Sequence, residues 1–323
     1  MATQRTIGLD IGGTKIAGGV VEADGTVLSE LVEPTPEDSD AEAVTAVLLD
    51  IVERLRAKHD GVTAIGVGAA GIVEWPQGRI VWAPNNAYRD WPVREQLEAA
   101  TGLPAVIDND ANVAVLAEAR LGARLYRELV LVTVGTGIGG GLVLGGQIYR
   151  GPTGRGAELG HIILNPDGPL CGCGNHGCFE AYASGTALTR MGREAAADDP
   201  GGLIARLGAE QGEVTGQTVT AAATQGDAVA QDLFGRLGRW LGVGIASLAN
   251  IFELEAVVVG GGLVSTGDLL LEPARRAARE FAFATQARET VPILPAVFGG
   301  DAGMIGAALL AIEDARPPAP IPQ

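Results

Sequence analysis

Residues 158–180 read ELGHIILNPDGPLCGCGNHGCFE and contain all three cysteines of the 323-residue chain, Cys171, Cys173 and Cys178. His161 lies ten residues before the first of them. Three thiolates and one imidazole are the ligand set of a closed tetrahedral zinc site, and the glycines between the cysteines allow the backbone to turn tightly around a metal. The stretch therefore predicts a small knot around a structural zinc ion.

Two other interpretations of these residues are open. One disulfide plus a free thiol also uses three cysteines, but Cys171 and Cys173 are too close in sequence to pair comfortably, and an odd number fits a disulfide framework poorly. A lone histidine such as His161 is more often packed or exposed than bound to a metal. Beside three cysteines zinc is favoured, and it would hold the flanking Glu158 and Glu180 on one rigid platform, which is typical of a substrate-binding site.

Composition and charge limit the classes of function. The chain is 47% hydrophobic with a formal net charge of -16, so it offers no basic surface for nucleic acid or for anionic membranes. Its length corresponds to about two domains of roughly 100 to 200 residues. No apolar run reaches the ~18 to 20 residues that span a bilayer. The first residues show no secretory leader pattern, and a cytoplasmic location is expected, where thiols stay reduced.

Strands and helices alternate along the chain, which indicates an α/β fold with a mixed sheet. The segment 133–144, TVGTGIGGGLVL, repeats the strand, turn and strand of LDIGGTKIAGGVV at 9–21, and this internal echo suggests two related lobes. Helical spacing of apolar residues predicts long helices near 41–58 and 228–252. Further predicted elements are three strands within 6–30, strands at 64–73, 105–110 and 256–264, and helices near 112–122 and 302–312.

Two glycine turns have the composition of phosphate-binding turns. The first supplies backbone amides, a hydroxyl, a cation and an acid able to hold the water of a metal ion. It lacks the GxxxxGK[ST] spacing, and a single such turn is often merely a tight turn, but two facing turns could clamp a polyphosphate. A third set after an apolar strand either leaves room for adenine or ribose or simply starts a helix. The residues are Asp10, Gly12, Gly13, Thr14, Lys15, then Gly135, Thr136, Gly137, then Gly261, Gly262.

The segment VIDNDAN places polar side chains where an apolar strand ends. Side chains at this point of an open α/β sheet project toward bound ligands. Asp110 could accept the proton of a hydroxyl that attacks phosphorus, and Asn109 could bind a neighbouring hydroxyl. Alternatively, Asp110 caps the helix that follows. Different residues of the same turn could hold the two roles.

Eight motifs in order, covering nearly the whole chain, resemble the ROK family of sugar kinases and repressors: DIGGTK, GVGAAGIV, APNN, NDAN, GTGIGGG, GAELGH, CGCGNHGCFE and VVVGGGLV. The resemblance implies a two-lobed actin-like ATPase (ribonuclease H-like) fold with a central cleft and the small zinc knot. We expect a small lobe over 1–110 plus about 300–316, a large lobe over 111–299 that contains the zinc-binding segment, and a proline-rich tail over 317–323.

The resemblance also implies an activity, and is strongest to the bacterial kinases of glucose. ATP with Mg²⁺ would donate its γ-phosphate to the glucose 6-hydroxyl, and Asp110 would be the general base. His161 would bind zinc through one ring nitrogen and sugar through the other, and a homodimer or homotetramer is expected. The implied sugar-binding residues are Gly71, Asn85, Asn109, Asp110, Glu158, His161 and Glu180, with Asn86 a possible replacement for Asn85.

Other functions of the family are open at this point. The sugar could be fructose, mannose or an N-acetylhexosamine, because few residues read a hydroxyl pattern, and polyphosphate could be the donor. The repressors of the family carry an N-terminal helix-turn-helix domain, for which the expected start of the first phosphate turn at Asp10 leaves no room. A sugar-sensing protein without catalysis is disfavoured because Asp110 and both phosphate turns are intact.

Overall fold

The computed structural model of the chain describes residues 4–36, 40–83 and 88–314. It contains two five-stranded mixed sheets, which confirms the predicted α/β class. Contacts divide the chain into two compact units: unit 1 comprises 1–127, 141–157 and 297–323, and unit 2 comprises 128–140 and 158–296. Three segments that the sequence assigned to the large lobe, 111–127, 141–157 and 297–299, are grouped with unit 1 by these contacts. The predicted proline-rich tail, 317–323, lies outside the described residues, as do Asn85 and Asn86.

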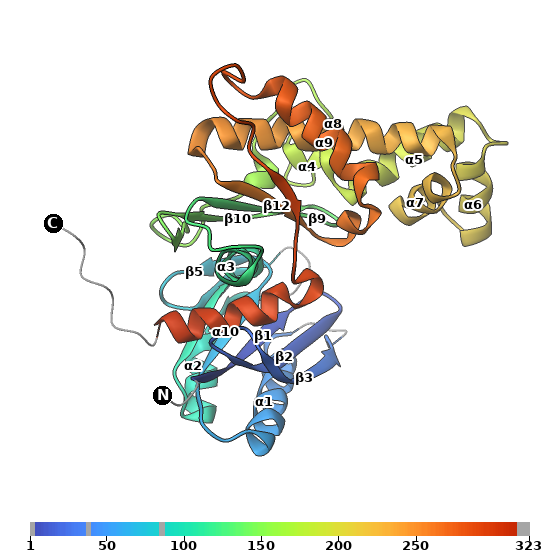
Figure 1. Cartoon of the computed structure of the whole chain (residues 1–323). Coiled ribbons are helices and arrows are strands. Elements are labelled where there is room, and N and C mark those ends of the chain that lie inside the picture. Colours follow the sequence, from blue (N-terminus) through green and yellow to red (C-terminus); the bar gives the residue numbers. More distant parts are fainter. Residues whose placement is uncertain (1–3, 37–39, 84–87, 315–323) are drawn as a thin grey trace. The chain divides into compact units, whose positions relative to one another are not determined.

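The first sheet belongs to unit 1 and has the strand order β3-β2-β1-β4-β8 (Figure 1). Its first three strands form the antiparallel meander predicted for the start of the chain. β4 pairs in parallel with β1, and β8 pairs in parallel with β4, so these three strands end at the same edge. The strands are β1 (Arg5–Ile11), β2 (Lys15–Glu22), β3 (Val27–Pro34), β4 (Val62–Ala69) and β8 (Ala105–Asn109).

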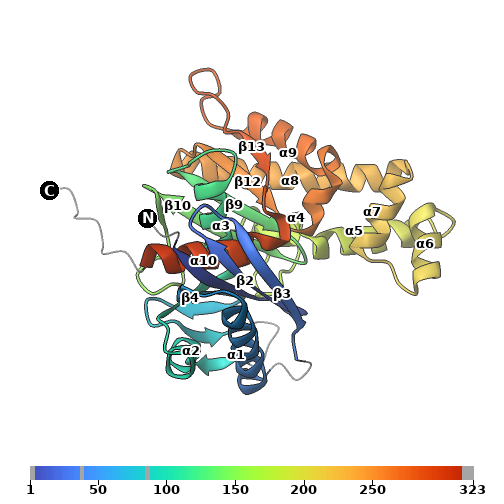
Figure 2. The ribbon, with the colours of Figure 1, turned by 60° about the horizontal axis from the view of Figure 1, so that its bottom comes forward.

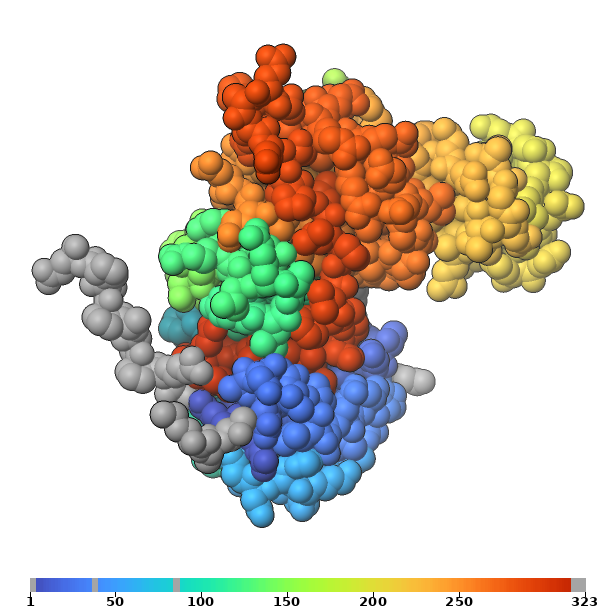
Figure 3. Space-filling model, viewed as in Figure 1, coloured from blue at the N-terminus to red at the C-terminus, as the bar shows by residue number. Residues whose placement is uncertain are grey.

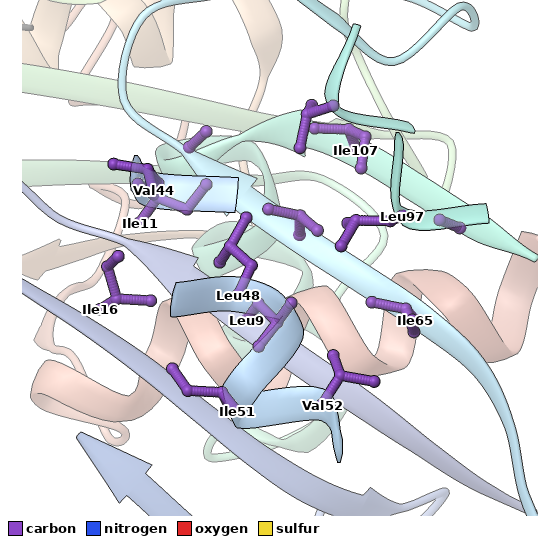
Figure 4. Packing of buried hydrophobic residues seen from close by; sticks show 14 of the residues in the cluster. Leu9, Ile11, Ile16, Val44, Leu48, Ile51, Val52, Ile65, Leu97 and Ile107 are labelled. Atoms are coloured by element: carbon purple, nitrogen blue, oxygen red, sulfur yellow. The ribbon is translucent and has the colours of Figure 1, made fainter. Parts of the chain in front are cut away.

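Helix α1 (Ala41–Lys58) covers one face of this sheet, and its bounds are those predicted from its apolar spacing. Asp40 caps it, since its carboxylate accepts a hydrogen bond from the Ala43 N–H at 2.6 Å. Figure 4 shows the resulting core, in which buried side chains of α1 point toward those of the strands. The labelled residues of this core include Leu9, Ile11, Ile16, Val44, Leu48, Ile51, Val52, Ile65, Leu97 and Ile107.

Helix α10 (Ala302–Asp314) lies on the opposite face of the sheet, beside α3 (Asp110–Leu121) (Figures 1 and 2). Two glycines that face each other across β1 and β4 allow this close approach. A Cβ at Gly8 would overlap the carbonyl oxygen of Met304, and a Cβ at Gly66 would overlap that of Ala307. The helix backbone therefore rests directly on the strands, and the Thr6 hydroxyl donates to the Ala308 carbonyl at 2.8 Å.

The second sheet has the order β11-β10-β9-β12-β13. β12 pairs in parallel with both β9 and β13, so the turns that follow β9 and β12 lie at the same edge. This arrangement brings the second and third predicted glycine turns together. The strands are β9 (Leu129–Val134), β10 (Ile138–Leu144), β11 (Gln147–Ile148), β12 (Ala256–Gly260) and β13 (Ile293–Pro295).

Helices make up most of residues 158–296 in unit 2. The long α8 (Ala228–Phe252) has the predicted bounds and packs along α9 (Asp268–Phe281). Three shorter helices gather at one end of the unit, yellow in Figures 2 and 3. They are α5 (Gly185–Asp198), α6 (Leu203–Gln211) and α7 (Gly216–Thr224). Among the described residues, no helix is long and apolar enough to cross a membrane.

The remaining elements are short. Unit 1 also contains a three-stranded antiparallel sheet that was not predicted; Trp75 lies in the turn between its first two strands, and Trp82 lies at the far end of the second strand. Its strands are β5 (Ile72–Glu74), β6 (Arg79–Trp82) and β7 (Arg89–Trp91), and α2 (Val93–Thr101) follows. The short helices are η1 (Leu159–His161), α4 (Phe179–Ala183), η2 (Gly262–Thr266) and η3 (Gly299–Asp301).

Candidate active site

The common edge of β1, β4 and β8 gathers the predicted residues of unit 1. In register, Asp10 on β1 stands opposite Gly68 on β4, and Asn109 on β8 stands opposite Ala69. The turn after β4 contains Gly71, and Asp110 directly follows β8. The four predicted residues Asp10, Gly71, Asn109 and Asp110 therefore share one end of the sheet.

The turn between β8 and α3 resolves the alternative that the sequence left open. Asn109 is the cap of α3, because its Oδ1 accepts hydrogen bonds from the N–H groups of Ala111 at 2.9 Å and Asn112 at 3.3 Å. Its Nδ2 donates to the Gly71 carbonyl at 3.1 Å. Asp110 is the first residue of the helix, and its Oδ1 accepts from the Ala111 N–H at 2.9 Å. Asn109 thus provides the cap and ties the turn to the loop after β4.

Two carboxyl groups influence each other at this edge. Burial raises the pKa of Asp10 to about 7, with repulsion from Asp110 as the second cause and the cation of Lys15 acting against both. Burial also raises the pKa of Asp110. A divalent cation would offset the repulsion, and carboxylate oxygens are the ligands that Mg²⁺ prefers. The residues present therefore fit a magnesium ion near Asp10.

The first glycine turn is held in place by hydrogen bonds within it and from Thr35. Within it the Gly12 N–H donates to the Lys15 carbonyl at 3.0 Å. The Thr35 hydroxyl donates to the Gly12 carbonyl at 2.8 Å, and the Thr35 N–H donates to the Thr14 carbonyl at 3.1 Å. Among the described residues other than its chain neighbours, no atom lies within 4 Å of the position that a Cβ of Gly13 would take. The tip of the turn is therefore open to a ligand.

The cysteine cluster in unit 2 has the dimensions of a metal site. One ligand atom each of His161, Cys171, Cys173 and Cys178 all lie within 4.8 Å of one another. The Cys171 Sγ is 3.8 Å from the His161 Nδ1, and the Cys173 Sγ is 3.6 Å from the Cys178 Sγ. Zinc–sulfur bonds of about 2.3 Å in a tetrahedron place two sulfurs about 3.8 Å apart, so the four residues fit Zn²⁺. The sulfurs are too far apart for the alternative disulfide, and all three cysteines are free.

Burial opposes the ionisation of two of the three thiols, raising the pKa of Cys171 and of Cys178, whereas a backbone hydrogen bond from Asn175 lowers the pKa of Cys173. Cys171 and Cys178 are buried, while Cys173 is exposed. Burial raises the pKa of the Cys171 thiol to about 12. A thiolate is the form that binds zinc, and a bound metal deprotonates its thiol ligands. Zinc binding would therefore convert the buried, protonated thiols into thiolates.

Glu180 joins the cysteine cluster to the second glycine turn. Its Oε2 accepts a hydrogen bond from the Ile138 N–H at 2.9 Å, and its Oε1 lies 3.6 Å from the Cys171 Sγ, which donates to it. A Cβ at Gly137 would overlap the same carboxylate, so the contact requires glycine there. Glu158 directly precedes η1, and its carbonyl accepts from the His161 N–H at 3.1 Å. Unit 2 thus brings its three predicted sugar-binding residues to one segment.

The second and third glycine turns also meet. The second turn is also held by the start of α5: the Gly135 carbonyl accepts a hydrogen bond from the Gly185 N–H at 2.8 Å, and the Thr136 carbonyl accepts one from the Thr186 hydroxyl at 2.8 Å. Gly261, with a φ of 85°, packs against the backbone of Val134, where a Cβ would overlap. This third turn starts η2, which is the alternative that the sequence analysis kept open. In the part of the chain that the structure describes, chain neighbours aside, no atom lies within 4 Å of a Cβ position at Gly262 or Gly135, which leaves space beside both turns.

Comparison with known proteins identifies the family. The model of the ROK family matches residues 6–314. The chain belongs to the ROK family. A glucokinase from Streptomyces coelicolor is 42% identical over 312 residues, covering 95% of this chain and 98% of the relative. An N-acetylmannosamine kinase from Escherichia coli is 35% identical over 312 residues, covering 95% and 98%.

A solved structure supports the same assignment. The chain is similar to the ROK family glucokinase from Streptomyces griseus in complex with glucose and AMPPNP, with a TM-score of 0.83 and 42% identity. The match covers 96% of this chain and 99% of that one. The α/β fold with mixed sheets is therefore that of ROK sugar kinases.

The sequence analysis missed two residues beside the site. Asp108 lies within the predicted apolar strand 105–110, and a carboxylate inside such a strand needs a partner. That partner is Arg150, which is distant in the sequence and outside the ROK motifs quoted above. The predicted sugar-binding residue Asn85 and its replacement Asn86 lie outside the described residues.

Proposed function

We propose that this protein is a glucokinase, which transfers the γ-phosphate of ATP to the 6-hydroxyl of glucose. The observation that carries the proposal is the identity of 42% with a glucokinase across 95% of the chain. The similarity to a glucokinase crystallised with glucose and AMPPNP points to the same pair of substrates.

In this proposal Asp110 is the general base. It would accept the proton of the 6-hydroxyl as that oxygen attacks the γ-phosphorus, and the burial that raises its pKa brings the carboxyl nearer to the value that suits proton transfer at neutral pH. Asn109 would bind a neighbouring hydroxyl through its amide, whose oxygen already caps α3. Gly71 would contribute through its backbone, and Asn85 is proposed from its motif alone.

Glu158, His161 and Glu180 are proposed to bind the other hydroxyls of the sugar. The His161 Nδ1 faces the Cys171 sulfur, so Nε2 is the nitrogen that remains for a hydroxyl. Zn²⁺ held by His161 and the three cysteines would have a structural role, because four protein ligands close its coordination. The second oxygen of Glu180 would keep its hydrogen bond to the Ile138 N–H.

The glycine turns are proposed to bind ATP. Open turn amides suit phosphate oxygens, and the threonine hydroxyls and Lys15 add further donors. Mg²⁺, when bound, supplies positive charge to the phosphate oxygens, and Asp10 would hold its water. The proposed nucleotide residues are Asp10, Gly12, Gly13, Thr14, Lys15, Gly135, Thr136, Gly137, Gly261 and Gly262.

The direct test is ADP release by the purified protein with ATP and Mg²⁺, measured with a panel of sugars. Glucose, mannose, fructose, N-acetylglucosamine and N-acetylmannosamine are compared at equal concentration, with inorganic polyphosphate as a second donor monitored by formation of sugar phosphate. We expect the highest kcat/KM with glucose and ATP. Preference for N-acetylmannosamine would favour the second candidate, which the relatives at 35% identity suggest.

No turnover with any sugar would contradict the kinase proposal and favour a sugar-sensing role. The test does not bear on the homodimer or homotetramer, or on the cytoplasmic location; both stay predictions.

A further inference from the structure

A buried ion pair lies directly behind the proposed catalytic turn, within unit 1. The Arg150 Nε is 2.5 Å from the Asp108 Oδ2, and the two side chains are only 13% and 3% exposed. The other oxygen of Asp108 accepts two hydrogen bonds, from the Asn109 N–H at 2.8 Å and from the Asn112 Nδ2 at 2.9 Å. One carboxylate therefore connects Arg150 to the backbone of the turn that presents Asp110.

The guanidinium of Arg150 is fixed on its other side by an aromatic ring. Its Cζ lies 3.8 Å from the centre of the Trp75 ring, within the range of a cation–π contact. The loop that carries Arg150 is itself held in place, because the Gly156 N–H donates to the Arg150 carbonyl at 2.8 Å. The Trp75 N–H donates to the Thr153 carbonyl at 3.4 Å. Arg150 is thus wedged between a carboxylate and a tryptophan.

The pair of Arg150 and Asp108 differs from the exposed ion pairs of the chain because it is buried. Exposed pairs such as Arg239 with Glu280, each 53% exposed, contribute little to stability. A buried carboxylate that loses its partner is an uncompensated charge in a poorly solvated place. Without Arg150 the Asp108 Oδ2 would lose its ion-pair partner, and a rotation of the carboxylate toward water would alter its bond to the Asn109 N–H.

We propose that Arg150 is a positioning residue for the phosphoryl transfer. Through Asp108 it holds the turn of Asn109 and Asp110 in the geometry that the reaction needs, without touching either substrate. The inference rests on the proposed kinase function. A displacement of about 1 Å in a reacting group costs up to about 100-fold in rate, so a clamp on this turn acts mainly on kcat.

The test compares four variants with the wild type for kcat, for KM of ATP and for thermal unfolding. In R150M we expect kcat with the preferred sugar to fall about 10- to 100-fold, while KM for ATP changes less than about twofold. R150K should recover only part of kcat, because lysine keeps the charge but lacks the planar fork. The matched control is R120M, since Arg120 forms a partly buried pair with Glu313 at 2.6 Å in the same unit. R120M should lose stability and keep kcat.

The double variant D108N/R150M separates positioning from stability. It removes the stranded charge, so its unfolding temperature should rise above that of R150M while its kcat stays at least about 10-fold below that of the wild type. Recovery of kcat together with the unfolding temperature would show that the pair is merely structural. A kcat of folded R150M within twofold of the wild type, or an equal loss in R120M, would also overturn the proposal. No turnover by the wild type with any sugar would instead contradict the proposed function.

Discussion

At the scale of single residues, the turn after β8 divides two tasks that the sequence could not separate. Asn109 caps α3 and bonds to the Gly71 carbonyl, which leaves Asp110 as the candidate for proton transfer. The identity of the cap depends on backbone angles that a DNDAN sequence does not determine, because aspartate and asparagine are about equally good caps.

Asp10 should make the free energy of unfolding fall as pH rises. Its pKa is about 7 in the folded protein, against about 3.9 for an unfolded aspartate. The stabilising contribution of the neutral carboxyl is complete below about pH 4 and is lost as pH rises through about 7. In D10N, which stays neutral, we expect a larger gain in unfolding temperature at pH 8 than at pH 5, measured without added Mg²⁺. An equal change at both values of pH would contradict the assignment.

Arg150 shows why part of the site could not be predicted from the sequence. It is 42 residues from Asp108 in the chain. Arg150 follows β11 and Asp108 lies in β8, so only the tertiary fold brings the two together. An arginine in a glycine-rich loop has no periodic pattern to identify it. In contrast, the cysteines, His161 and Glu180 lie within 20 residues and were predicted together as one segment.

At the scale of elements, long segments with clear apolar spacing were predicted well, and the shortest strands were missed. The predicted bounds of α1 and α8 agree with the structure, because many turns of apolar spacing define them. The strands β5 to β7 have three or four residues, too few for an alternating pattern. Helix α9 was also missed, and it contains Pro273, a residue that argues against a helix interior.

The zinc-binding segment combines a metal ligand set with backbone hydrogen bonds, such as the one from the Cys171 N–H to the Asn175 carbonyl at 2.8 Å. In C171S we expect bound zinc to fall from about one ion per chain to almost none. We also expect KM for glucose to rise at least about 10-fold, because the metal ligands and the residues around them orient one another. The measurements are zinc content by atomic emission and steady-state kinetics.

The control for the zinc prediction lies in the same segment. His176 hydrogen-bonds the Gly168 carbonyl through Nδ1 at 2.9 Å and is outside the cluster of four ligands, so H176N should keep its zinc. Wild-type kinetics in zinc-free C171S would argue against a link between metal and sugar binding. Equal zinc loss in H176N would argue against the assigned ligand set.

At the scale of the whole molecule, each unit contributes a different part of the proposed machinery. Unit 1 contains the proposed base and the first glycine turn, and unit 2 contains the zinc segment and two further glycine turns. The α/β class and the family were predictable because the motifs extend over nearly the whole chain. The sugar was not, since kinases of glucose and of N-acetylmannosamine are both similar over 95% of it.

The measurement that tests the central claim most directly is a comparison of wild type and D110N for both glucose binding and glucose-dependent ADP formation. We expect D110N to bind glucose with an affinity within about threefold of the wild type by calorimetry, while kcat falls by about 100- to 10,000-fold, the range for loss of a general base. Turnover by D110N near the wild-type rate, with glucose bound, would contradict the role of Asp110 as the base in a glucokinase.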